Sequence, residues 1–239
     1  MRRLLTATMM VLLTGSVAAQ PALPDEPEAE CVVLLHGLNR SERAMRPVKR
    51  FLEDQGYRVV NESYDSRSKR LPAIAEETVP ARIEQCGTAG AVHFVTHSMG
   101  GIVVRQYAEL YGPARIGRVV MLAPPNQGSE LVDRMRLVPL YDEILGRAGR
   151  QLGTDSTGVP VQLGPVQFET GVIAGNRSLT PFYSWIIPGK DDGKVSVDRA
   201  RVEGMADFLE VRENHTFLMR SEPVLAQTLH FLRHGAFDQ

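Results

Sequence analysis

Residues 91–101, which read AVHFVTHSMGG, decide the fold of this chain. Their first half is a short apolar run of the kind found in strands that are buried on both faces of a parallel sheet. After Ser98 an amphipathic stretch continues through Leu110 and stops at Gly112, as a helix would. The stretch therefore predicts a strand, a tight turn at the serine and a helix.

The rest of the chain alternates the same two patterns. Apolar runs predict further strands at 32–35, 57–61, 119–122, 185–187 and 208–211, and helical spacing predicts helices at 41–56, 74–85 and 223–233. Strands that alternate with helices imply an α/β fold with a mainly parallel central sheet and helices on both faces. The alternation lapses between 126 and 180, where we expect one or two helices and a loop at 153–164.

Length and charge narrow the class of protein. The chain has 239 residues, of which 43% are hydrophobic, and this suits a single domain with a substantial core. Its formal net charge is −1, without the basic excess that marks proteins that bind nucleic acid. We therefore expect no nucleic-acid partner.

The N-terminus predicts export. Residues 1–19 combine two arginines, an apolar run and a small-residue end, which is the pattern of a signal peptide. The run is too short and too interrupted by polar residues to span a bilayer as an anchor. Residues 20–30 are acidic and rich in proline and read as a flexible tail, so the predicted domain is 31–239. A periplasmic or secreted protein is expected.

Two cysteines, Cys31 and Cys86, would enter that oxidising compartment. An even pair there favours a disulfide. Free cysteines are also commonly buried as small apolar side chains, and the sequence leaves both readings open.

The turn at Ser98 has the features of a nucleophile turn. A serine hydroxyl becomes a good nucleophile when an imidazole takes its proton, and it must be held out on a constrained strand-to-helix turn. The residues two before and two after such a serine are small because strand and helix approach closely. Gly100 fits this Gly-x-Ser-x-Gly pattern, and Thr96 departs from it, although Gly101 and the strand-turn-helix context favour the same interpretation. The alternative is a serine that caps a helix.

A second motif, His36-Gly37-Leu38, ends the first predicted strand. A loop there can bring a backbone N–H close to the serine, and stabilising an oxyanion requires two such donors. We assign them to the amides of Leu38 and Met99. The imidazole of His36 is expected to bind loop backbone and to take no part in catalysis.

The acid and the base of a serine triad on this kind of turn follow the nucleophile along the chain, each in a loop after a strand. The loop 188–193 holds Asp191 and Asp192, and the loop 212–216 holds His215. We favour Asp192 because the following glycine lets its carboxylate turn back toward the site. The alternative is that both aspartates build a solvated turn.

The other histidines fit structural roles better. His93 and His97 flank or occupy the buried strand and its turn, and His230 and His234 lie on the last helix without the glutamate that a metalloprotease helix carries. The aspartates lack the EF-hand spacing, and no phosphate-binding or dinucleotide glycine pattern is present. We predict no metal and no cofactor.

Taken together, these motifs resemble the α/β-hydrolase superfamily, in particular its bacterial lipase and esterase-like serine hydrolases. The resemblance runs from about Cys31 to the C-terminus and rests on 33–38, 96–101, 189–195 and 214–216. It implies hydrolysis of carboxylic esters through an acyl-enzyme, with Ser98 as nucleophile, His215 as base and Asp192 as the acid that orients it.

The resemblance also implies a small cap insertion after the sixth strand, which we assign to 126–180. Its apolar residues would face an acyl chain or would simply be core. Expected partners are small-molecule or lipid esters, with a transient contact with a lipid surface left open. An acyltransferase with the same triad, or a non-catalytic binding protein on the same fold, would share this sequence pattern.

Overall fold

The computed structural model describes residues 29–87, 90–139 and 141–239, so the predicted signal peptide and most of the predicted tail lie outside it. Six strands form one parallel sheet in the order β2-β1-β3-β4-β5-β6. The strands are β1 (Cys31–Leu35), β2 (Arg58–Val60), β3 (Val92–His97), β4 (Ile116–Leu122), β5 (Thr170–Gly175) and β6 (Asp207–Val211). The predicted α/β fold class is confirmed.

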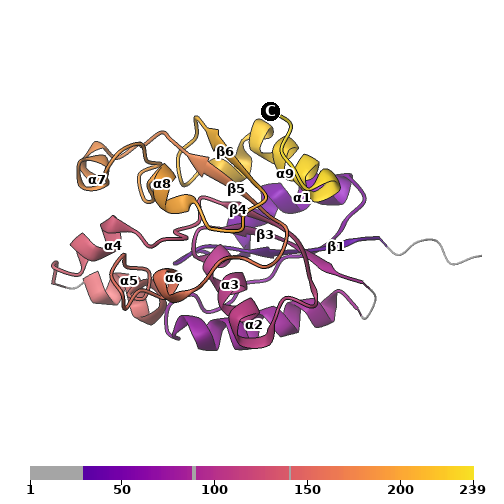
Figure 1. Ribbon diagram of the computed structural model, residues 1–239, viewed down its shortest axis with the longest axis horizontal. Coiled ribbons are helices and arrows are strands. Elements are labelled where there is room, and N and C mark those ends of the chain that lie inside the picture. Colours follow the sequence, from indigo (N-terminus) through magenta and orange to yellow (C-terminus); the bar gives the residue numbers. More distant parts are fainter. Residues whose placement is uncertain (1–28, 88–89, 140) are drawn as a thin grey trace, which may run out of the picture.

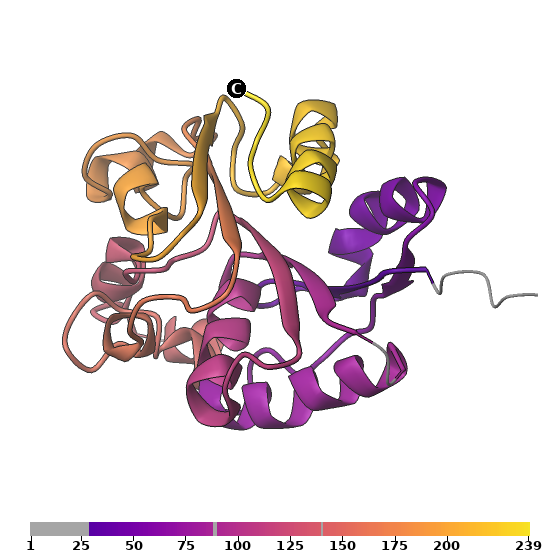
Figure 2. The same ribbon diagram turned by 45° about the vertical axis from the view of Figure 1, so that its right-hand side comes forward.

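Two helical layers cover the sheet. Figure 1 places α2 (Leu71–Gln85) and α3 (Met99–Tyr111) on one face, and α1 (Arg46–Asp54) and α9 (Glu222–His234) on the other; Figure 2 shows the same layers from a second side. Alternate residues of β1 belong to two separate apolar clusters, one on each face. Both faces of the sheet are therefore buried, which explains why the strands read as continuous apolar runs.

The register of the central strands brings their following loops together. Leu35 at the end of β1 lies opposite Thr96, and His97 at the end of β3 lies opposite Leu122 of β4. Ligand and active sites of open parallel sheets form at this carboxyl edge. The motif after β1 and the turn at Ser98 are thus neighbours.

Cys31 and Cys86 form a disulfide, which decides between the two readings of the sequence. Cys31 begins β1, and Cys86 directly follows the last residue of α2. The bridge therefore fastens the C-terminal end of α2 to the start of β1, the strand next to the sheet edge.

Most of the remaining short helices gather beyond the carboxyl ends of the strands (Figure 1). They are α4 (Glu130–Met135), α5 (Tyr141–Gly149), α6 (Val159–Gln162), α7 (Pro181–Ile186) and α8 (Val197–Ala200), while the short 3₁₀ helices η1 (Glu42–Met45) and η2 (Leu218–Arg220) precede α1 and α9. No helix of the described ranges is long and apolar enough to cross a membrane.

Three expectations about this region need correction. The insertion follows β4, the fourth strand along the chain rather than the sixth, and it ends before residue 170 because 170–175 is strand β5 of the sheet, between β4 and β6. The strand predicted at 185–187 is wrong, since this stretch ends helix α7 and leads out of it. Pro181 starts that helix, and Trp185 is 86% exposed, so the apolar run does not enter the sheet.

Candidate active site

Ser98 sits between β3 and α3 in a backbone conformation that side chains rarely adopt, with φ of 53° and ψ of −124°. A non-glycine residue in this region costs on the order of 1–3 kcal/mol and persists only where the surroundings enforce it. The N–H of Ser98 donates to the carbonyl of Leu122 at 2.8 Å, which fixes the turn to β4. The serine therefore has the strained turn that the sequence predicted.

The close approach of strand and helix explains the glycine at position 100. A Cβ on Gly100 would lie 2.6 Å from the carbonyl oxygen of Leu35, which real Cβ atoms do not do. Any larger residue would push α3 away from β1. The requirement for a small residue two positions after the serine is thus steric.

Thr96, the departure from the usual pattern, is fully buried. A Cβ on Gly101 would lie 3.3 Å from the Thr96 hydroxyl oxygen and equally close to Pro124. The missing side chain at Gly101 therefore leaves the space that the threonine uses. The second glycine compensates for the absent first one, and the turn keeps its shape.

The structure brings Asp192 and His215 together. His215 Nδ1 donates to Asp192 Oδ2 at 2.7 Å, and both residues are buried. The other carboxylate oxygen, Oδ1, accepts the backbone N–H groups of Lys194 and Val195, each at 2.9 Å. With its proton on Nδ1, the imidazole keeps Nε2 as an acceptor.

Asp191 has different partners. Its Oδ1 accepts the N–H of Gly193 at 2.7 Å and the hydroxyl of Ser184 at 3.0 Å, and burial raises the pKa of its carboxyl. It ties the loop to α7 and makes no bond to His215. The two aspartates thus differ in their partners, and of the two Asp192 is the one bonded to His215.

His97, directly before the serine, supports the histidine loop. Its Nε2–H donates to the carbonyl of His215 at 2.9 Å, and the two ring centres are 4.8 Å apart. Complete burial, followed by the nearby His215, lowers the pKa of His97 well below its ordinary value of 6.5. A neutral imidazole here places no extra positive charge beside His215.

The predicted oxyanion donors flank the serine. A Cβ on Gly37 would come within 3.1 Å of Ser98 Cβ, so the loop after β1 passes directly over the nucleophile. Met99 opens α3, where a backbone N–H has no acceptor within the helix. Within the described part of the chain, no acceptor is recorded for the N–H of Leu38 or of Met99. Both amides are available to a ligand.

His36 binds loop backbone, as expected from the sequence. Its Nδ1–H donates to the Gly37 carbonyl at 2.9 Å, Nε2 accepts the N–H of Tyr64 at 3.2 Å, and the Tyr64 ring stacks on it at 4.2 Å. Burial lowers the pKa of His36. It is not among the residues that line the cavity at Ser98.

A cavity of about 270 Å³ opens at Ser98 and His215. One part of its lining comes from the loop Gly37–Arg40. An apolar wall is formed by Leu131, Val132, Ile144, Leu145 and Leu152 of the insertion. Some of these residues also belong to the core, so the insertion contributes both to the cavity wall and to packing.

Two charged residues of this cavity, Arg40 and Lys194, were not singled out from the sequence. Each lies two residues beyond a predicted functional residue, Leu38 in one case and Asp192 in the other. Extending each motif by two positions would have found them.

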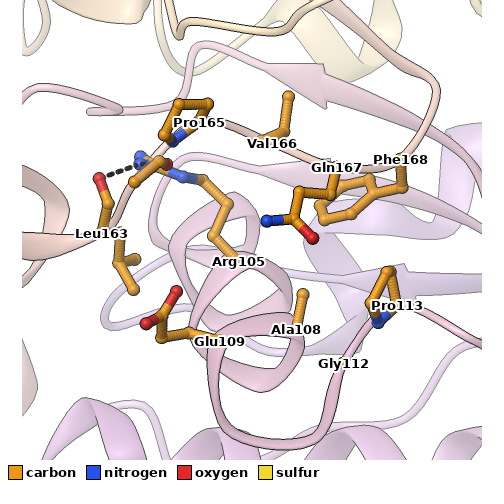
Figure 3. A pocket seen from close by; sticks show the side chains of 11 residues that line it. Arg105, Ala108, Glu109, Gly112, Pro113, Leu163, Pro165, Val166, Gln167 and Phe168 are labelled. Atoms are coloured by element: carbon orange, nitrogen blue, oxygen red, sulfur yellow. Dashed lines mark hydrogen bonds between the residues drawn. The ribbon is translucent and has the colours of Figure 1, made fainter.

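A second cavity of about 270 Å³ lies away from this site, at the C-terminal end of α3. Figure 3 shows the Arg105 side chain reaching toward Leu163 and Pro165. The buried guanidinium donates to four backbone carbonyls, those of Asn126, Pro160, Leu163 and Gly164. Burial lowers its pKa to about 10. This arginine fastens the insertion to α3 and has no link to the serine.

No metal site is evident among the residues that the structure describes. No group of three histidine, cysteine, aspartate or glutamate side chains in the described ranges is arranged to hold a metal ion. His230 and His234 have ring centres 4.4 Å apart on α9, and His230 Nδ1 is bonded to the carbonyl of Ala236.

Comparison with solved structures agrees with this architecture. The mature form of the Bacillus licheniformis lipase BlEst2 superposes with a TM-score of 0.72 at 18% identity, covering 89% of this chain and 96% of that one. A thermophilic esterase from Thermogutta terrifontis gives a TM-score of 0.59 at 16% identity, covering 87% and 91%. A metagenomic carboxyl esterase gives 0.56 at 20% identity, covering 84% and 71%. At these identities the likeness concerns the fold.

No curated protein matches the chain by sequence. A family model described as the alpha/beta hydrolase fold matches residues 30–165, more than half of the chain. The chain therefore belongs to the α/β-hydrolase fold family.

Proposed function

We propose that this hydrolase cleaves carboxylic esters by a serine mechanism with an acyl-enzyme intermediate. The observation that carries the proposal is the bonded pair Asp192–His215 at 2.7 Å, whose imidazole lines the same cavity as the strained Ser98. A nucleophile, a base and a group that orients the base are the three parts such a mechanism needs.

Acylation begins when Ser98 Oγ attacks the ester carbonyl and its proton passes to His215 Nε2. The imidazolium that forms is stabilised by the Asp192 carboxylate, which accepts from Nδ1 throughout. The carbonyl oxygen becomes an oxyanion and accepts hydrogen bonds from the amides of Leu38 and Met99. When the tetrahedral intermediate collapses, the alcohol leaves with the proton from His215, and the acyl group remains on Ser98.

Deacylation repeats these steps with water. His215 takes a proton from water, the hydroxide attacks the acyl carbonyl, and the second tetrahedral intermediate releases the acid and restores the Ser98 hydroxyl. The atoms balance as one ester and one water giving one acid and one alcohol. The same groups act twice, so the site needs no cofactor in this scheme.

The apolar wall of the cavity suits the hydrocarbon part of a small-molecule or lipid ester. Leu131 and Leu145 bring apolar side chains from two helices of the insertion to this wall. We therefore assign the acyl chain to the insertion side of the cavity.

The disulfide supports export to an oxidising compartment, because such bonds are rare in reducing cytoplasm. Together with the signal-peptide pattern of residues 1–19, this favours a periplasmic or secreted hydrolase.

Burst kinetics with 4-nitrophenyl butyrate test the proposal. Wild type should release a first equivalent of 4-nitrophenol followed by slower turnover, and Ser98→Ala should fall by several orders of magnitude. Ser156→Ala, an exposed serine outside the cavity, serves as matched control and should match wild type.

Three other outcomes have distinct meanings. Absence of hydrolysis with short and long acyl esters would favour a binding protein. Equal rates for wild type and Ser98→Ala would refute the nucleophile. Adding a primary alcohol separates a hydrolase from an acyltransferase, because a transferase forms mainly the new ester at low alcohol concentration.

A further inference from the structure

Two cations face the catalytic cavity from loops that are distant in sequence. Arg40 follows the loop over the nucleophile, and Lys194 follows the acid of the proposed triad; both line the cavity with Ser98, and both are exposed. In the described part of the chain, neither forms an ion pair with a carboxylate. Neighbouring cations do pair: Arg43 with Glu42, and Lys190 with Glu210.

The two charges act on each other. Lys194 is exposed as a whole residue, but partial burial of its ammonium lowers the pKa and the charge of Arg40 lowers it further, while Asp192 opposes the shift. The Asp192 carboxylate is already engaged by His215 and by two backbone N–H groups. Lys194 uses its backbone for that contact, and no described residue forms a hydrogen bond or ion pair with its ammonium.

A neutral ester has no charged group that Arg40 and Lys194 could bind. Two like charges at one cavity raise the free energy of the empty site, and a bound anion between them would lower it. Apolar side chains of the insertion line the same cavity, which therefore combines hydrocarbon surface and two cations around the reacting serine.

The cationic surface extends beyond the cavity. An adjoining groove shares Asn39 and Arg40 with it and is also lined by Arg43 and Arg220. Arg220 lies over the Phe217 ring at 5.8 Å, and Glu42, the acid nearest to Arg43, is engaged by Ser63 and Arg46. An anionic group therefore meets net positive charge along its approach to Ser98.

We propose that Arg40 and Lys194 bind a negatively charged group of the substrate, so that the preferred ester carries a carboxylate or phosphate near its scissile bond. The inference rests on the proposed ester hydrolysis and specifies its substrate class. Arg40 and Lys194 are specificity-determining residues in this account, and they take no part in the bond-making steps. Carboxylate and phosphate share the relevant chemistry, since both accept charge-assisted hydrogen bonds from guanidinium and ammonium groups.

Matched ester pairs test this. The first pair is methyl pentanoate and monomethyl glutarate, in which a carboxylate replaces a terminal methyl group. The second is 1-butyrylglycerol and 1-butyrylglycerol 3-phosphate, which carries the anion on the alcohol side as a lipid headgroup does. For at least one pair, we expect kcat/KM to be about tenfold or more higher for the anionic member. The pair that shows the preference identifies the source of the anion.

Variants assign the preference to residues. Arg40→Gln and Lys194→Gln should each reduce the ratio of anionic to neutral kcat/KM about fivefold or more, mainly through KM, and added salt should reduce it in wild type. Arg50→Gln removes an equal charge from an exposed position on α1, outside both the cavity and the adjoining groove, and should keep the ratio. Equal kcat/KM within both pairs, or a preference that survives both cavity variants, would overturn the proposal.

A binding measurement separates failure of this inference from failure of the hydrolase proposal. Calorimetric titration of Ser98→Ala with both members of each pair requires no turnover. Tighter binding of the anionic member, lost when Arg40→Gln or Lys194→Gln is added, would support the anion site even without hydrolysis. Ser98-dependent hydrolysis without charge preference would leave the hydrolase proposal standing and overturn the anion site alone.

Discussion

Replacing Asp192 by asparagine tests the proposed triad through a single atom exchange. Two backbone N–H groups, of Lys194 and Val195, donate to Oδ1, so the amide oxygen of the new side chain must take that position. The amide nitrogen then faces His215 Nδ1, where the carboxylate oxygen now lies at 2.7 Å. Because an amide N–H can only donate, it forces Nδ1 to accept and moves the imidazole proton to Nε2.

That tautomer cannot take a proton from Ser98. Loss of the correct tautomer in a serine triad lowers kcat about 10⁴-fold, which corresponds to about 5.5 kcal/mol of transition-state stabilisation. The exchange keeps the size and shape of the side chain, so the folded structure should persist. Steady-state kinetics with 4-nitrophenyl butyrate and circular dichroism measure the two effects separately.

Asp191→Asn is the matched control. Its amide oxygen can still accept from Gly193 N–H and the Ser184 hydroxyl, and Asp191 makes no contact with His215. We expect kcat within about threefold of wild type. A folded Asp192→Asn variant with kcat within tenfold of wild type, or an equal loss in both variants, would refute the assignment of the acid.

Four further predictions concern stability and the turn. Replacing Cys31 and Cys86 by alanine should lower the free energy of unfolding by about 4 kcal/mol in urea titrations, since the bridge closes a loop with a sequence separation of 55; a loss below about 1 kcal/mol would contradict this. Arg105→Met should cost about 2–4 kcal/mol in the same assay because buried carbonyls lose their donor, and an unchanged midpoint would contradict it. Gly100→Ala should reduce both stability and esterase activity, because its Cβ would lie 2.6 Å from a β1 carbonyl; wild-type kinetics would speak against the steric account. Burial holds the pKa of His97 well below 6.5, so below that pH the unfolded chain binds a proton there that the folded chain does not. The free energy of unfolding should therefore fall as the pH drops below about 6.5, by up to about 1.4 kcal/mol per pH unit. His97→Gln should reduce this dependence of the free energy of unfolding on pH between pH 7 and 5, and an unchanged slope would disprove the account.

Most of the fold was predictable because local patterns and tertiary environment agree. The strands around 32–35, 91–95 and 119–122 are buried on both faces, so burial appears directly as apolar runs. The turn at Ser98 needs a small residue two positions later for steric reasons, and the glycine found at position 100 makes this requirement visible in the sequence. The proposed acid and base follow from chain order, because each loop must end at the carboxyl edge of the sheet.

Strand β5 was missed for a physical reason. It reads TGVIAG, with small residues at four of its six positions, and carries little of the apolar signal of its neighbours. Gly171 is required because Phe231 packs 2.6 Å from where its Cβ would lie, a contact that only the tertiary structure reveals. The more apolar stretch at 185–187 was taken for a strand, although its tryptophan is exposed.

Arg40 and Lys194 were missed although the motifs just before them were assigned to one site. Each reads as an ordinary surface cation, and the sequence does not show which side chains of those loops line the cavity. The disulfide was undecided for the same reason, because bonding requires a distance that two cysteines in a sequence do not provide.

Covalent labelling of Ser98 tests the central claim most directly. A fluorophosphonate reacts with a serine that an adjacent base activates, and intact-mass analysis counts the adducts. The account predicts one adduct per chain, located by peptide mapping on Ser98 and absent from Ser98→Ala. A wild-type protein that remains unlabelled, or an adduct that persists in Ser98→Ala, would contradict it.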